Sequence, residues 1–207
     1  MSTVRFFRQR RFLGGAVAIL IAFLVGAQNH AFAHNASPDS LFEALRGGGH
    51  VVYFRHAATT RSGVDRIEWP RERQRLLSAE GIQDSEDIGA ASQLLALPIG
   101  EVIASPFARC RDMAEIAFGQ VEERFELLGL LSDDSGRAER IAYLRDRMST
   151  PTGEAGNRII VSHRSNIREV AGVSLGEGDA VVVKPLGDGD FRILGTLRPA
   201  DWRAVVD

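Results

Sequence analysis

The sequence predicts an α/β fold, a three-layer sandwich in which a mostly parallel central sheet is covered by helices on both faces. Short apolar, β-branched runs alternate along the chain with amphipathic helical segments, the order that builds parallel sheets. Two of these runs lead directly into a histidine: Val51-Val52-Tyr53-Phe54-Arg55-His56 and Ile159-Ile160-Val161-Ser162-His163. Hydrophobic residues make up 44% of the 207, which suits a globular domain with a substantial core.

The first 33 residues have the organisation of an export signal. Four arginines precede an apolar stretch of 16 residues, and Ala31-Phe32-Ala33 then resembles a cleavage site. We therefore expect a Sec-type signal peptide over residues 1–33, a single domain over residues 34–207, and a periplasmic or secreted bacterial protein. The alternative is an uncleaved inner-membrane anchor. The apolar stretch is shorter than the roughly 20 residues of a spanning helix, which favours cleavage and no stable membrane span afterwards.

Composition excludes some classes of partner and site. Four of the 25 basic residues lie in the predicted signal, against 27 acidic residues in the rest, so the mature chain has a net charge near −6. That balance argues against phosphate-backbone binding, and we expect no nucleic-acid partner. The single cysteine, Cys110, excludes an intramolecular disulfide. It falls in an apolar helical pattern, which indicates a buried core residue and not a nucleophile.

The first part of the chain predicts a helix, a strand and a long irregular segment. A helix over Ser37–Arg46 is expected, with Ser40 and Glu43 as its capping box. The strand that begins at Val51 follows. Residues 58–77 are polar and rich in arginine without a sustained period, which is typical either of a lid or substrate loop or of a solvated surface loop.

The remaining elements alternate. A helix after Ser105-Pro106 is expected to use Ser105 as its cap and Pro106 as its first residue. A strand is expected around Phe125–Leu128. The other expected elements, in order, are a helix over 78–97, a strand over 101–104, a helix over 138–148, a strand over 158–161, a short helix ending at Gly172, and closing strands over 180–183 and 191–197.

Four side chains near the ends of three strands suggest phosphoryl chemistry: Arg55, His56, Arg109 and His163. Ligand crevices of open α/β sheets lie at the carboxyl ends of the strands. Guanidinium groups bind phosphate oxygens bidentately, and a neutral imidazole can attack phosphorus. We predict that His56 forms a phosphohistidine while Arg55, Arg109 and a protonated His163 hold the phosphoryl oxygens. Carboxylate or cysteine partners at ligand spacing are missing, so we expect no metal and no other cofactor.

These residues resemble the motifs of the histidine phosphatase superfamily, in particular its small exported bacterial branch. The R-H-G/A signature corresponds to Arg55-His56-Ala57, S-P-x-x-R to 105–109, and the second histidine to Val161-Ser162-His163. Residues 177–181 also look like the family's stretch before its final strands. The resemblance covers roughly residues 38–200. It implies a phosphoglycerate mutase-like fold, His56 as nucleophile, and a phosphate pocket of Arg55, Arg109 and His163.

The chain departs from the family in its general acid. Arg164 follows the second histidine, where the acid-phosphatase branch would have an acidic residue. The mutase branch takes its acid from the interval between the second arginine and the second histidine. No motif selects among the candidates, which are Asp65, Glu68, Glu122, Glu123, Glu126, Asp133 and Asp134. Arg164 would either extend the pocket or cap the following helix.

Two functions from different classes fit these residues. The first is a phosphatase that hydrolyses a phosphomonoester or related phosphoryl group on a small molecule, glycan or protein. The second is a non-catalytic phospho-ligand-binding protein on the same scaffold. Both histidines and both arginines are present, which favours the enzyme, whereas the unassigned acid favours the binder. A mutase is disfavoured by export, because phosphorylated metabolic intermediates are cytoplasmic.

Overall fold

The computed structural model describes Met1 and residues 36–132, 135–153 and 156–207. Apart from Met1, the predicted signal peptide and its cleavage point lie outside these residues, as do two of the candidate acids, Asp133 and Asp134. In the part of the chain that is described, no helix combines the length and the apolar character needed to cross a membrane.

A six-stranded sheet forms the centre of the domain, with strand order β3-β2-β4-β1-β5-β6. The first four strands in the chain run parallel, β5 pairs antiparallel with β1, and β6 pairs antiparallel with β5 at the edge of the sheet. The mostly parallel α/β sheet predicted from the sequence is therefore confirmed. The strands are β1 Val51–Arg55, β2 Ile99–Ala104, β3 Glu122–Glu123, β4 Asn157–Ser162, β5 Ala180–Gly187 and β6 Asp190–Leu197.

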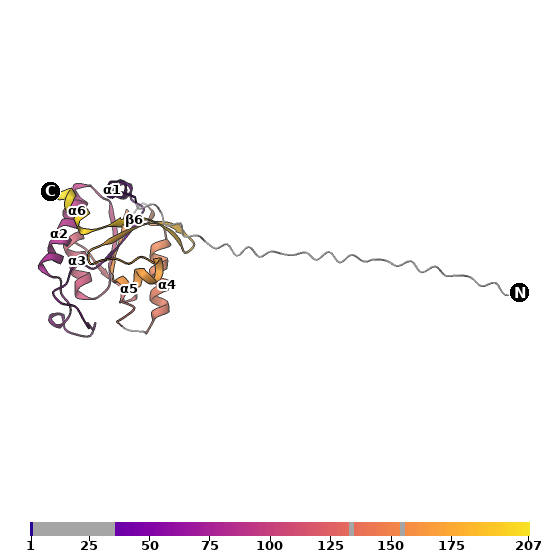
Figure 1. The fold of residues 1–207 in the computed structure, drawn as a ribbon, viewed down its shortest axis with the longest axis horizontal. Helices are drawn as coiled ribbons and strands as arrows, with labels where there is room; N and C mark the ends of the chain where they lie inside the picture. Colours follow the sequence, from indigo (N-terminus) through magenta and orange to yellow (C-terminus); the bar gives the residue numbers. More distant parts are fainter. Residues whose placement is uncertain (2–35, 133–134, 154–155) are drawn as a thin grey trace. The chain divides into compact units, whose positions relative to one another are not determined.

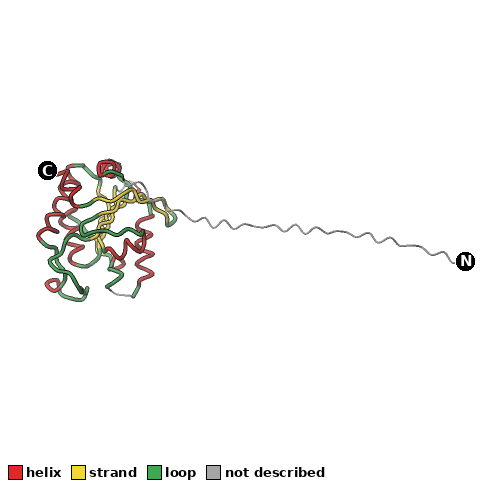
Figure 2. Tube along the Cα trace, viewed as in Figure 1, coloured by secondary structure: helices red, strands yellow, loops and turns green. Residues whose placement is uncertain are grey.

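Helices cover the sheet on both faces, as Figures 1 and 2 show. Because side chains alternate along a strand, Val52 and Phe54 of β1 pack with α1, α2, α3 and α6, while Val51 and Tyr53 pack with α4 and α5. Each face thus has its own apolar core, and the three-layer sandwich is confirmed. The helices are α1 Pro38–Arg46, α2 Ala79–Leu94, α3 Ala108–Phe118, α4 Arg137–Ser149, α5 Arg164–Ala171 and α6 Pro199–Val206.

Three local predictions are wrong. Helix α1 is capped by Ser37, whose Oγ accepts from the Ser40 N–H at 3.3 Å, because Pro38 already takes the first helical position. The segment Phe125–Leu127 is a 3₁₀ turn, and β3 is the shorter pair just before it. Helix α3 begins at Ala108, with Phe107 and not Ser105 at its N-cap.

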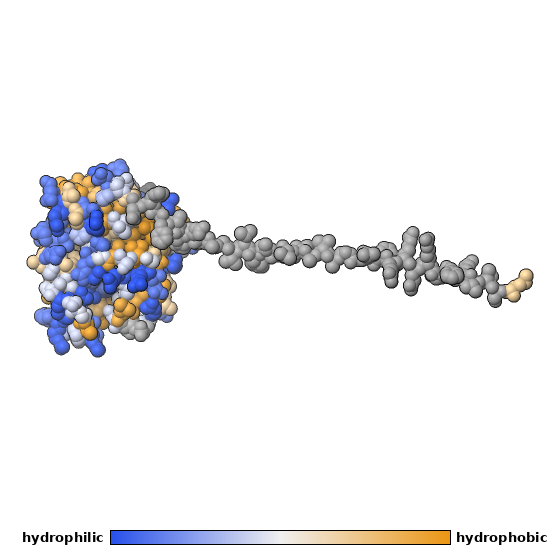
Figure 3. Space-filling view, in the orientation of Figure 1, coloured by the Kyte–Doolittle hydropathy of each residue, from blue (hydrophilic) through white to orange (hydrophobic). Residues whose placement is uncertain are grey.

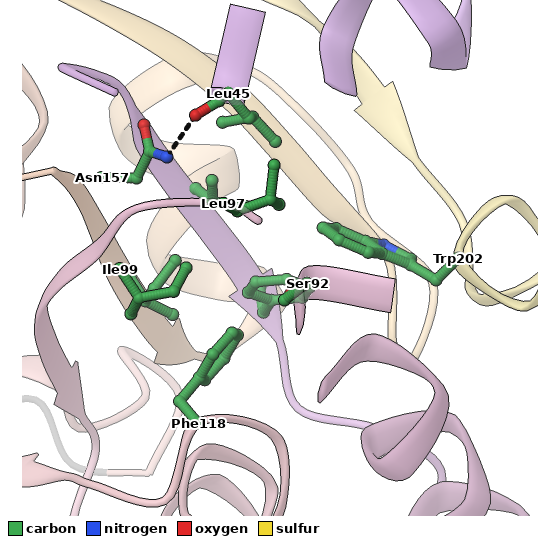
Figure 4. Close-up of a pocket in the computed structure, with 10 residues that line it drawn as sticks. Leu45, Ser92, Leu97, Ile99, Phe118, Asn157 and Trp202 are labelled. Carbon is green, nitrogen blue, oxygen red and sulfur yellow. Dashed lines mark hydrogen bonds between the residues drawn. The ribbon is translucent and has the colours of Figure 1, made fainter. Parts of the chain in front are cut away.

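A small apolar cavity of about 10 Å³ lies at the opposite end of the sheet from the predicted site, near the starts of β2 and β4. Figure 4 shows Phe118 and Trp202 beside it, and Asn157 Nδ2 donating to the Leu45 carbonyl at 2.7 Å. A space of this size holds one water molecule at most. It is a packing void of the core and has no room for a ligand.

Candidate functional site

The two predicted histidines follow neighbouring parallel strands. Arg55 at the end of β1 pairs with Ser162 at the end of β4, so His56 and His163 are the next residue on each strand. The His56 N–H donates to the Ser162 carbonyl at 3.0 Å, and the ring centroids of the two histidines are 5.7 Å apart. Strand register alone therefore brings both imidazoles to the same edge of the sheet.

A cavity of about 650 Å³ opens at this edge. It is lined by all four predicted site residues, Arg55, His56, Arg109 and His163, together with Arg75, Phe107 and Arg164. Its walls come from two loops, residues 63–68 and 128–132, of which the first is visible in dark purple at the lower left of Figure 1. The volume is typical of a site for a small molecule or a single side chain of a larger substrate.

His56 is buried, and its contacts indicate which ring nitrogen carries the proton. Its Nδ1 lies 2.9 Å from the Ala57 carbonyl, which can only accept, so the proton is on Nδ1 and Nε2 keeps its lone pair. Burial lowers the pKa of His56 well below 6.5, and the positive charges of Arg109 and Arg55 lower it further. The imidazole is therefore neutral at neutral pH.

His163 is held by three elements. Arg109 Nη2 donates to its Nδ1 at 3.2 Å, so its proton is on Nε2, which lies 2.9 Å from Ser105 Oγ. The Tyr53 hydroxyl donates to the His163 carbonyl at 2.8 Å and accepts from its N–H at 3.1 Å. Burial and then the positive charge of Arg109 lower the pKa of His163 well below 6.5, so this histidine is neutral in this structure. The protonated His163 predicted from the sequence belongs to the site with a phosphoryl group bound.

Arg55 and Arg75 form a second basic group in the cavity. Both Nη2 atoms contact Glu177 Oε1, at 2.9 Å from Arg55 and 3.3 Å from Arg75. Arg55 also donates to the Leu175 carbonyl at 3.1 Å. Sequence reasoning missed Arg75 as an individual residue, although the run of arginines after the β1 strand end was the signal that could have found it.

The contacts of Arg109 indicate which kind of group the site would bind. Its Nη1 contacts Asp65 Oδ2 at 2.5 Å, and both side chains are about 95% buried. Its guanidinium also lies over the Phe107 ring, 4.3 Å from the centroid. Among the described residues, nothing accepts from its buried Nε. An unpaired buried donor costs about 1–3 kcal/mol, so Arg109 has an unsatisfied preference for one more acceptor.

The candidate acids separate clearly by position. Asp65 and Glu68 line the cavity, whereas Glu122, Glu123 and Glu126 do not. The Glu68 side chain is 63% exposed and pairs with Arg66 at 3.5 Å, while Asp65 is enclosed. Arg164, at the start of α5, also lines the cavity. Of its two predicted roles, its position therefore agrees with extension of the pocket.

Comparison with known proteins places this arrangement on a known fold. No model of a protein family matches the chain, and no curated protein sequence matches it. The solved structure of SixA, a protein histidine phosphatase in complex with tungstate, superposes with a TM-score of 0.53 at 16% identity, covering 73% of this chain and 98% of SixA. The fold is phosphoglycerate mutase-like.

Other enzymes share this phosphoglycerate mutase-like fold. The alpha-ribazole phosphatase of Shigella flexneri gives a TM-score of 0.51 at 14% identity, covering 70% of this chain and 94% of its own. A phosphoserine phosphatase of Entamoeba histolytica, solved with phosphoserine, gives 0.50 at 12% identity, covering 73% and 98%. All three of these structural neighbours are phosphatases. At such identities the likeness concerns the fold, and the chemistry of this chain must be argued from its own residues.

The buried neutral histidines of this phosphoglycerate mutase-like domain predict acid sensitivity. In the unfolded chain each histidine takes up a proton near pH 6.5, but in the folded chain only at much lower pH. The unfolded state therefore binds more protons below pH 6.5, and the free energy of unfolding falls there by up to about 1.4 kcal/mol per pH unit for each histidine. Urea unfolding between pH 7.5 and 5 measures this slope.

The control for that slope is His163→Asn. It removes one of the two titrating groups, so the dependence between pH 6.5 and 5 is expected to become shallower than in the wild-type protein. An equal slope in both proteins would contradict the assignment of a neutral, buried His163.

Proposed function

We propose that this protein is a phosphatase that hydrolyses a phosphomonoester or related phosphoryl group through a phosphohistidine on His56. The observation that carries the proposal is the environment of His56: a buried neutral imidazole, with its Nε2 lone pair unprotonated, in one cavity with Arg55, Arg109 and His163. A neutral imidazole beside fixed cations is what attack on a phosphorus dianion requires.

The other residues act on the charge of the phosphoryl group. Arg55 and Arg109 bind its oxygens, and the unpaired Nε of Arg109 gains the acceptor that it otherwise lacks. The negative charge of the bound group raises the pKa of His163, which then donates to a third oxygen. His56 Nε2 attacks phosphorus, the leaving oxygen departs, and water later cleaves the P–N bond to release phosphate.

A non-catalytic phospho-ligand-binding protein remains the second candidate, since the same arginines would hold a bound phosphate without turnover. The state of His56 favours the enzyme. A histidine that only held phosphate would serve best as a protonated donor, whereas burial and two arginines keep His56 unprotonated. An unprotonated imidazole can attack phosphorus, but it holds a bound phosphate less well than a protonated imidazole does.

The substrate and its location are further parts of the proposal. The structural neighbours include a protein histidine phosphatase, an alpha-ribazole phosphatase and a phosphoserine phosphatase, so this fold accepts protein and small-molecule substrates alike. The sequence of the first 33 residues supports export, and we propose a small exported branch of the histidine phosphatases. Its substrate would then be a small molecule, glycan or protein that carries a phosphoryl group in the periplasm or outside the cell.

Phosphate release from p-nitrophenyl phosphate, combined with trapping of the intermediate, tests the function. The protein is mixed with labelled substrate, denatured within the first turnover, and divided between alkaline and acidic conditions. We expect phosphate release and a protein-bound label that survives alkali and is lost in acid, as a phosphoramidate is. Binding of tungstate without phosphate release or label would instead favour the phospho-ligand-binding protein.

A further inference from the structure

We propose that Asp65 is the general acid of this site, and that it is put in place when a phosphoryl group takes over its position on Arg109. The inference rests on the proposed phosphatase function and adds to it a catalytic residue from a loop in which no family motif was found. It starts from the contact of two buried, oppositely charged side chains inside a cavity that also holds the nucleophile.

Asp65 is bound as an anion ligand would be. Its Oδ2 accepts from Arg109 Nη1 at 2.5 Å and from the Arg75 N–H at 3.0 Å, and its Oδ1 accepts from the Arg66 N–H at 3.1 Å. A carboxylate and a phosphoryl group offer similar oxygen pairs to a guanidinium. Asp65 therefore occupies one of the donors that a phosphoryl group would need.

Arg109 can exchange one anion for the other. Its Nη2 is committed to His163 and its Nη1 to Asp65, while its buried Nε lacks an acceptor among the described residues. A phosphoryl group that contacts Nε and Nη1 satisfies the unpaired donor and releases the carboxylate. Asp65 lies in the irregular segment 58–77 and not in the sheet, so it can shift while His56 and His163 stay in place.

The exchange changes the charge that Asp65 experiences. Its charged neighbours are Arg109 from α3 and Arg75 from its own loop, and the two histidines of the strand ends are neutral. Once Arg109 serves the phosphoryl dianion, the carboxylate lies next to like charge and holds a proton more tightly. Binding of the substrate thus leads to protonation of Asp65, which can then act as the acid.

The proton then balances both chemical steps. As the His56 Nε2 lone pair forms the P–N bond, the P–O bond breaks, and the leaving oxygen takes its electron pair together with the Asp65 proton. In the second step the Asp65 carboxylate accepts a proton from water, whose oxygen bonds to phosphorus. The P–N electron pair returns to His56, and phosphate leaves.

Substrates that differ only in their leaving group test the role of Asp65. Phenyl phosphate needs a proton on its leaving oxygen far more than p-nitrophenyl phosphate does. We expect Asp65→Asn to lower kcat/KM, which includes the steps only up to departure of the leaving group, by about 10²-fold for phenyl phosphate and only a few-fold for p-nitrophenyl phosphate. Glu72→Gln removes an exposed carboxylate of the same segment that does not line the cavity, and should change neither.

Equal losses for both substrates would overturn the proposal, because they would indicate that Asp65 only positions Arg109. Equal gains for both would also overturn it, since they would show a carboxylate that merely blocks the pocket. An Asp65→Asn variant with unchanged rates for both substrates would overturn the proposal as well.

Proton uptake separates this proposal from the proposed function. Tungstate is a dianion that carries no proton at pH 7, so its binding can be followed by calorimetry in buffers of different ionisation enthalpy, without any turnover. We expect Asp65→Asn to take up about one proton fewer on binding tungstate than the wild-type protein does, and Glu72→Gln to match the wild type. Equal uptake by all three proteins would overturn the exchange, whether or not phosphate release is found.

Discussion

His56→Ala is expected to abolish phosphate release, lowering kcat by at least about 10⁴-fold. Among the described residues that line the cavity, none offers a nitrogen that can take the place of Nε2, because the Nδ1 atom of His163 accepts from Arg109 and its Nε2 carries a proton. The alkali-stable label should disappear together with turnover. Tungstate should still raise the melting temperature of the variant, because the arginines that bind it are retained.

The matched control is His50→Ala. His50 is also next to β1, but it precedes the strand, its Nδ1 lies 2.8 Å from the Gly48 carbonyl, and it does not line the cavity. Its removal should leave kcat unchanged. Turnover that persists in His56→Ala would show that another group attacks phosphorus, and the proposed intermediate would then be wrong.

Arg109→Met is expected to lower kcat/KM by about 10³-fold, the upper range for loss of one preorganised donor to a developing anion. The substitution keeps much of the side-chain length but removes the contacts to His163 and Asp65 and the donor reserved for the phosphoryl group. Tungstate affinity, measured by calorimetry, should fall with it. Circular dichroism checks the fold, because Asp65 is left buried without its cation.

Arg109→Lys and Arg111→Met complete that experiment. Lysine keeps the positive charge beside Asp65 but not the planar fork, so the fold should be retained while tungstate affinity stays low. Arg111 is two positions away on α3 and pairs with Glu123 at 3.1 Å outside the cavity, so its removal should have no effect on affinity. Unchanged affinity in both Arg109 variants would contradict its assignment to the phosphate pocket.

The ends of β1 and β4 could be predicted from the sequence, because the run of apolar residues stops where polar side chains begin. In β1 and β4, buried apolar runs stop at a polar pair, and parallel pairing then places His56 beside His163 without any further information. Helix starts were less predictable. Ser105 and Pro106 look like a cap, but the Ser105 hydroxyl is next to His163, a preference that only the tertiary structure creates.

The loop residues could not be assigned from the sequence for a physical reason. Asp65 and Arg109 are 44 residues apart, and the segment that carries Asp65 has no period from which the orientation of a side chain follows. The same applies to Arg75. The neutral state of His163 depends on burial and on the field of Arg109, neither of which a motif contains.

The site has a part that is held by the sheet, to which Tyr53 belongs, and a part that is formed by loops. Its hydroxyl holds both backbone groups of His163 from the strand that also presents His56, so the geometry around phosphorus belongs to the sheet. The residues that would meet the leaving group belong to two loops, in which Val64 and Leu131 are largely exposed. The face of the molecule in Figure 3 shows apolar residues among hydrophilic ones. Selectivity can therefore diverge while reactivity is kept, provided that Asp65 and Arg75 stay in the loop: exchanging Val64 and residues 66–68 around them should redirect the proposed phosphatase to another alcohol.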